Sequence, residues 1–235
     1  VLLARGLAQA SGKRIRLSTK AIVGATSKGL SGQIDAMFVA GPPPDAAVIM
    51  IGANDITKPN GVGPSARRLG RAVQRLRAGG AVVTVGTCPD FGLITAIPQP
   101  LRWVARGRGL RLARAQAAEV RSAGGVPVPF SDLLAPHFSK TPEVLFSSDM
   151  FHPSAAGYEL AALQLLPALC EELGESVPEM PSEQALESRT ARHGSLLARV
   201  SRLWRRSTGV PAPVLGGVPG LAQGRVAAPN MASAG

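Results

Sequence analysis

Along residues 1–174, continuous apolar runs alternate with segments whose apolar residues recur at helical spacing. The apolar runs lie at 45–55, 81–90 and 125–134, and a mixed basic and apolar stretch at 14–24 closes as a fourth run. Helical patterns occupy 1–12, 30–41, 65–80, 101–123 and 154–173. Strands that are covered on both faces read as continuous apolar runs, so this order predicts an α/β fold with an open, three-layer, doubly wound parallel sheet.

The character of the chain changes after Gly174. Residues 175–187 are polar and broken by Pro, and the last 29 residues hold six Gly and four Pro. We therefore expect one α/β domain over 1–174 and a disordered tail over 175–235. Within that tail, 188–206 carries six Arg and no acid. Two interpretations of 188–206 stay open: an amphipathic helix in weak contact with anionic lipid, or a solvated and partly helical segment.

Composition argues against several classes of function. The net charge of +11 is spread, with 19 Lys/Arg against 11 Asp/Glu in 1–174 and 7 against 4 in 175–235, and the chain has one Tyr and two Trp. Without a basic stripe, stacking aromatics or zinc-finger spacing, we expect no nucleic-acid partner. Cys88 and Cys170 fit no metal or redox spacing, so we interpret them as packing thiols and expect no metal. Gly24 and Gly29 are followed by Leu30 where a nucleotide-binding loop needs Lys, which excludes ATP and GTP.

Polar residues that could carry chemistry lie where predicted strands or loops end. Gly24 closes the run at 14–24, and Asn54 lies at the end of the run at 45–55. Asp149 and His152 lie just before Pro153, a residue suited to the first turn of the last helix. These residues also have ordinary interpretations: Gly24 as a turn glycine, Asn54 as a capping amide and His152 as a structural histidine. The functional one is a backbone donor, an amide donor and an Asp–His pair at the carboxyl edge of the sheet.

Taken together, these positions resemble three of the four marker blocks of the SGNH hydrolases, the GDSL esterase/lipase family. The second block matches Gly24, the third, G-x-N-D, matches Gly52, Asn54 and Asp55, and the last, D-x-x-H, matches Asp149 and His152. The stretches at 84–92 and 97–103 also look like actinobacterial members. The resemblance covers about residues 1–174 and implies a flavodoxin-like sheet, a Ser-His-Asp triad and no cofactor. It also implies that Asn54 and Gly24 are oxyanion donors.

The first block, in which the family carries its nucleophilic serine in G-D-S, has no counterpart in the sequence. We therefore expect the first strand and its serine to precede Val1, and the 235 residues alone to be inactive. The resemblance implies hydrolysis of a small-molecule, lipid or glycan ester by a monomeric bacterial protein. Two alternatives remain: an O-acyltransferase or deacetylase acting on cell-envelope glycan, and an inactive member that binds ligands. The localisation is not predicted.

Overall fold

Three parallel strands form the centre of the protein, whose computed structural model describes residues 1–177. They are β1 (Ala46–Met50), β2 (Val82–Gly86) and β3 (Val126–Val128), and their order in the sheet is β1-β2-β3. In the register, Val48 is opposite Thr84, and Thr84 is opposite Val126. The predicted α/β fold is therefore confirmed. The reversal of strand order that defines a doubly wound sheet does not occur among the described strands.

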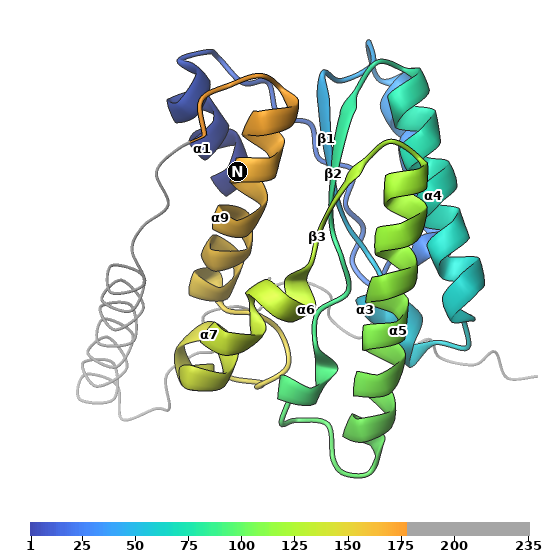
Figure 1. Cartoon of the computed structure of the whole chain (residues 1–235), viewed down its shortest axis with the longest axis vertical. Coiled ribbons are helices and arrows are strands. Elements are labelled where there is room, and N and C mark those ends of the chain that lie inside the picture. Colours follow the sequence, from blue (N-terminus) through green and yellow to red (C-terminus); the bar gives the residue numbers. More distant parts are fainter. Residues whose placement is uncertain (178–235) are drawn as a thin grey trace, which may run out of the picture.

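Helices cover both faces of this sheet (Figure 1). On one face lie α1 (Leu2–Ser11) and α9 (Ala155–Glu172), and on the other lie α2 (Leu30–Val39), α4 (Val62–Ala78) and α5 (Leu101–Ser122). Short helices follow the strands: α3 (Ala53–Thr57) after β1, then α6 (Phe130–Leu133), α7 (Ala135–Lys140) and α8 (Pro142–Leu145) after β3. Two 3₁₀ turns span Ser27–Gly29 and Phe91–Leu93.

Alternation along the strands divides the core into two faces. Val83 and Val85 of β2 are fully buried against α2, α4 and α5, whereas Val48 and Val82 pack towards α1 and α9. Leu69, Val73 and Leu76, which recur at helical spacing within the predicted helix at 65–80, are all at most 2% exposed. Burying such side chains contributes about 1.5–3 kcal/mol each, which explains why their spacing determines the face of the helix.

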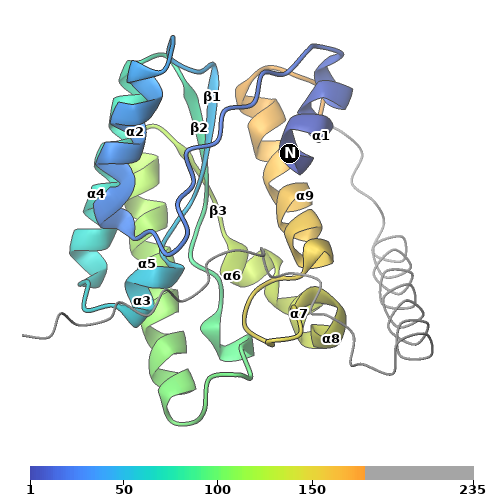
Figure 2. The same cartoon turned by 180° about the vertical axis from the view of Figure 1, so that it is seen from behind.

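The predicted strand at 14–24 is wrong. The segment has no strand hydrogen bonds within the described residues and its side chains are exposed, with Leu17 at 52%, Ile22 at 64% and Val23 at 103%. Figure 2 shows it passing β1 on the outer side of the sheet without joining it. A strand needs a partner for its N–H and C=O groups, and among the described residues β1 pairs only with β2.

The edge of the sheet at β1 is open as a result. Four of the five β1 residues are half-buried and Met50 is 52% exposed, although the sequence of this strand is wholly apolar. A parallel strand of that composition is normally covered on all sides. The surroundings of β1 thus differ from those of β2, four of whose five residues are buried.

The predicted tail at 175–235, including the basic segment 188–206, lies outside the described residues except for 175–177. The last described helix, α9, ends at Glu172. No helix within residues 1–177 is long and apolar enough to span a membrane.

Candidate active site

A tight loop between α8 and α9 carries the Asp–His pair. Phe146 and Pro153 form an isolated antiparallel bridge, and the Ser147 N–H donates to the His152 carbonyl at 2.7 Å. Met150 takes a left-handed φ of +51° at the tip of the loop. The loop ends at Ser154, whose Oγ accepts from the Gly157 N–H at 3.2 Å and so caps α9. Pro153 was predicted to begin this helix, but the helix begins at Ala155 because Ser154 supplies the cap.

Asp149 and His152 are brought together as predicted. The Oδ2 atom of Asp149 lies 2.7 Å from Nδ1 of His152, while Oδ1 accepts from the backbone N–H groups of Phe151 and His152, each at 3.0 Å. The bond to the His152 ring and then the two backbone bonds lower the pKa of Asp149 from 3.8 to about 2. An ionised carboxylate can only accept, so Nδ1 carries the hydrogen, and in the neutral ring Nε2 has a free lone pair. The His152 side chain is 66% exposed.

Gly24 and Asn54 are also neighbours in space. Asn54 lies in the first turn of α3, and its Nδ2 donates to the Ala25 carbonyl at 3.0 Å. The Lys58 ammonium donates to the Gly24 carbonyl at 3.2 Å. Two hydrogen bonds therefore join the loop at Gly24 and Ala25 to α3 and to Lys58, the residue that follows α3. Gly24 has φ +73°, a conformation that side chains with a Cβ rarely adopt. One amide hydrogen of Asn54 is used in this contact, which leaves the second for a ligand.

Asp55 is the buried hub of this region, a role that the sequence analysis did not predict. It is 2% exposed and accepts four hydrogen bonds, two from Ser27 and one each from Asn60 and Ser65, at 2.7–3.0 Å. The 3₁₀ turn after Gly24, the loop after α3 and the first turn of α4 are thereby bound to one carboxylate. Ser27 and Asp55 are 28 residues apart in the sequence, so no local pattern indicated this contact.

Gln116 is a second residue that the sequence analysis missed. Its buried amide donates to the Ile51 carbonyl and accepts from the Cys88 N–H, both at 2.8 Å, and so links the ends of β1 and β2. Gly52, with φ +127°, lies against it, since a Cβ there would be 2.7 Å from Gln116 Nε2. The available signal was a glutamine at helical spacing from buried Leu112 and Val120 in an otherwise apolar stripe.

The four predicted site residues form two pairs. Asp149 lies with His152 and Gly24 with Asn54, and no hydrogen bond among residues 1–177 joins one pair to the other. Both pairs lie beyond the carboxyl ends of the strands, the edge at which such sheets bind ligands (Figure 1). Within the same residues no Ser or Thr hydroxyl is hydrogen-bonded to the His152 ring, and no three His, Cys, Asp or Glu form a metal-binding group.

The two cysteines are buried and free, in agreement with their interpretation as packing thiols. Burial, followed by the charges of Asp55 and Asp90, raises the pKa of Cys88 to about 12. A thiol with so high a pKa stays protonated at neutral pH and is a poor nucleophile.

Comparison with known proteins agrees with the resemblance seen in the sequence. GDSL-like esterase Rv1075c of Mycobacterium tuberculosis (strain ATCC 25618 / H37Rv) is 64% identical over 209 residues, which cover 86% of this chain and 66% of that protein. The chain thus spans slightly under two thirds of the length of this relative.

Two solved structures have the same fold at low identity. The lipase/acylhydrolase from Enterococcus faecalis has a TM-score of 0.56 at 18% identity, covering 76% of this chain and 86% of its own. Axe2, an acetylxylan esterase from Geobacillus stearothermophilus, has a TM-score of 0.54 at 22% identity, covering 76% and 82%. The model of the GDSL-like Lipase/Acylhydrolase family matches residues 1–160, more than half of the sequence. The chain therefore belongs to the GDSL-like lipase/acylhydrolase family.

Proposed function

We propose that the intact protein hydrolyses carboxylic esters through a Ser-His-Asp triad in which Asp149 and His152 are the acid and the base. The observation that carries this proposal is the 2.7 Å contact between Asp149 Oδ2 and His152 Nδ1, which fixes the tautomer of a solvent-exposed ring. Membership of the family and the strong identity to a GDSL-like esterase support the same reaction.

In this mechanism Nε2 of His152 takes the proton of a serine hydroxyl as the serine attacks the ester carbonyl. Asp149 holds the ring and offsets the positive charge that the ring acquires. The negative charge on the carbonyl oxygen is stabilised by the free amide hydrogen of Asn54 and the N–H of Gly24. His152 then returns its proton to the leaving alcohol, and water repeats the sequence on the acyl-enzyme.

We further propose that the nucleophilic serine lies on a strand that pairs with the open edge of β1, in a part of the protein outside these 235 residues. Support comes from the half-buried side chains of β1 and from the unpaired segment at 14–24, which would lie on the other side of such a strand. The added strand would restore the predicted order of a doubly wound, flavodoxin-like sheet. The same proposal explains why the described residues offer His152 no hydroxyl partner.

Hydrolysis of p-nitrophenyl acetate tests both proposals. We expect the longer protein to hydrolyse this ester, and the 235-residue chain to show no rate above that of its own His152→Ala variant. In the longer protein, His152→Ala should reduce kcat by about 10⁴–10⁶-fold, because the triad acts as a unit.

Two results would contradict these proposals. A His152-dependent rate in the 235-residue chain would show that the nucleophile lies within it. Full activity of His152→Ala in the longer protein would remove His152 from the mechanism. Repeating the assay with an added glycan alcohol and analysing the products distinguishes hydrolysis from acyl transfer to the sugar.

A further inference from the structure

Within residues 1–177, the excess positive charge lies on two helices that pack side by side. Helices α4 and α5 carry eleven of the 26 Lys and Arg residues and one acid, Glu119, against a net charge of +11 for the chain. The rest of the described residues hold eight Lys or Arg and eleven Asp or Glu. The two helices form one layer of the molecule, so this charge is concentrated on one side (Figure 1).

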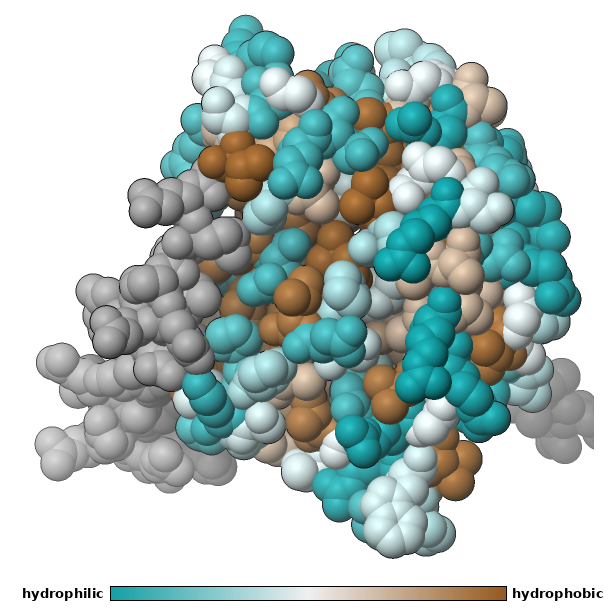
Figure 3. Space-filling model, in the orientation of Figure 1, coloured by the Kyte–Doolittle hydropathy of each residue, from teal (hydrophilic) through white to brown (hydrophobic). Residues whose placement is uncertain are grey.

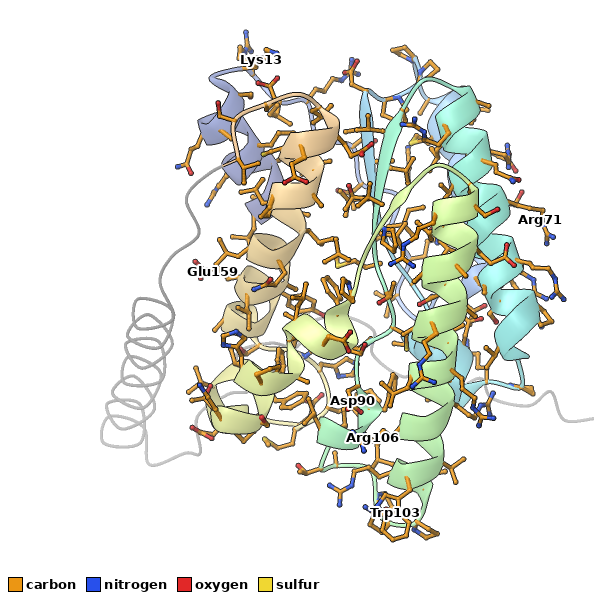
Figure 4. The ribbon with its side chains drawn as sticks, viewed as in Figure 1. Lys13, Arg71, Asp90, Trp103, Arg106 and Glu159 are labelled. Atoms are coloured by element: carbon orange, nitrogen blue, oxygen red, sulfur yellow. The ribbon has the colours of Figure 1, made fainter. Side chains whose placement is uncertain are left out.

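Most of these arginines have no acidic partner. Arg75 pairs with Asp35 and Arg106 pairs with Asp90. The other nine make no ion pair within the described part of the chain. We call these nine the basic face: Arg67, Arg68, Arg71, Arg77, Arg102, Arg108, Arg111, Arg114 and Arg121. Figure 4 shows Arg71 pointing away from the molecule on the outer side of α4.

Exposed apolar side chains lie at one end of this face. Leu101, Trp103 and Val104, which we call the apolar tip, form the first turn of α5 and are 58%, 70% and 55% exposed. In Figure 4 Trp103 lies at the extreme lower end of α5, just below Arg106, and in Figure 3 hydrophobic residues lie at the lower end of the mainly hydrophilic α4–α5 side. Leaving three neighbouring large apolar residues in water has a cost, so their exposure together requires an explanation.

We propose that the basic face and the apolar tip form a surface that docks on an anionic lipid bilayer. Arginines gain free energy near a negatively charged leaflet, and Trp is the residue best suited to the boundary between headgroups and acyl chains. A nucleic acid or another soluble polyanion would use the arginines but gains little from Leu101 and Val104, whereas a bilayer uses both parts of the surface.

Because of where the apolar tip lies, docking would bring the bilayer to the end of the molecule that carries the candidate active site. The tip begins α5 at the carboxyl-end edge of the sheet, the edge that also carries the loop with Asp149 and His152 (Figure 1). Leu93, which lines a shallow pocket together with Trp103, and Phe151, next to His152, pack against the same hydrophobic cluster. A bilayer held at the tip therefore lies at the same end of the molecule as the candidate site. The docking itself requires no catalysis, so it stands or falls independently of the proposed ester hydrolysis.

Co-sedimentation of the full 235-residue chain with vesicles tests this surface. We expect binding to phosphatidylcholine vesicles that contain 30% phosphatidylglycerol, weakening as salt rises, and little binding to pure phosphatidylcholine. The triple variant Arg67→Ser, Arg71→Ser, Arg114→Ser should bind about 100-fold more weakly, at about fivefold for each arginine. Its matched control, Arg5→Ser with Arg14→Ser and Arg16→Ser, removes three exposed charges elsewhere. The fold-change in vesicle binding of this control should be less than a tenth of that of the triple variant.

A second pair of variants tests the apolar tip at constant charge. Leu101→Ser with Trp103→Ser should weaken binding about tenfold or more, whereas Val23→Ser with Val39→Ser, at two apolar positions that are even more exposed, should not change it. Circular dichroism of each variant serves to check that the variant is folded. The region beyond residue 177 is the same in every variant, so it cannot produce these differences.

Three results would overturn the proposal. One is the absence of binding to anionic vesicles. Another is binding that falls equally in each variant and its control, which would assign the contact to overall charge or to the rest of the chain. The third is insensitivity of vesicle binding to the tip variant, together with equally tight binding of duplex DNA, which would make the basic face a general polyanion site.

Discussion

Asp149 binds the ring of His152 with one carboxylate oxygen, at 2.7 Å, and with its other oxygen binds the backbone N–H of the same residue, at 3.0 Å. One side chain thus determines both the path of the loop and the orientation of the ring. The contact is local, between residues three positions apart, and it does not depend on the rest of the sheet.

Titration of Asp149 should reveal this contact. We expect the ¹³C resonance of its carboxyl to titrate near pH 2 in the wild-type chain and at higher pH in His152→Ala, because that variant loses the largest cause of the lowered pKa. The backbone bonds from residues 151 and 152 remain, so the value should stay below 3.8. His137→Ala, which changes a histidine on α7, is the control and should leave the titration unchanged.

The same lowered pKa predicts how the pair affects stability. The pKa of Asp149 is lower in the folded protein than the ordinary 3.8. Its contribution to stability is therefore complete above about pH 4 and is lost as pH falls through about 2. Urea unfolding at pH 6 and pH 2.5 should show a smaller loss on acidification for Asp149→Asn than for wild type. An equal loss in both proteins would contradict the assignment.

Removing the buried carboxylate of Asp55 should destabilise the protein far more than removing an exposed one. In Asp55→Ala, Ser27, Asn60 and Ser65 lose a buried acceptor, and we expect a loss of about 3–5 kcal/mol in the free energy of unfolding. Asp35→Ala, which breaks an exposed ion pair with Arg75, should cost less than about 1 kcal/mol. Urea denaturation measures both, and comparable losses would argue against a hub at Asp55.

Features that depend on neighbours in the sequence could be predicted, and features that depend on pairing at a distance could not. The buried stripe of α4 follows from its 3.6-residue period, and the Asp149–His152 contact from its three-residue spacing. The strand at 14–24 was mispredicted because its local pattern is that of a strand, but a strand also needs a neighbour. Gln116 was missed because its partner Ile51 lies 65 residues away.

The charge distribution is a second feature that depends on segments far apart in the sequence and could not be predicted. Dividing the chain at residue 174 indicated that the positive charge is spread, and that division hid its concentration on α4 and α5. These helices are separated in sequence by β2 and its loop, and only their packing in one layer makes them a single surface. Gly24 and Asn54 similarly acquired their paired role from the resemblance to the family, since their spacing of 30 residues predicts no contact by itself.

Gly52 should tolerate no side chain. In Gly52→Ala the Cβ would lie 2.7 Å from Gln116 Nε2 at a φ of +127°, and we expect a loss of about 3 kcal/mol from strain and crowding together. Gly107→Ala is the matched control: this glycine lies in α5 with nothing within 4 Å of an added Cβ. That variant should gain about 0.5–1 kcal/mol from the higher helix propensity of Ala. Urea denaturation separates the two, and a neutral Gly52→Ala would refute the crowding argument.

Asn54 should affect the rate of ester hydrolysis more than substrate binding. In the longer protein, Asn54→Ala removes the amide hydrogen proposed to stabilise the oxyanion, and we expect kcat to fall about 10²–10³-fold, with a much smaller change in KM. The same variant loses the bond to the Ala25 carbonyl, so its Tm is measured alongside its activity. Thr57→Ala, on the exposed side of the same short helix, is the control, and its kcat should stay within about twofold of wild type. A folded Asn54→Ala protein with unchanged kcat would exclude Asn54 as an oxyanion donor and leave that role to backbone N–H groups such as that of Gly24.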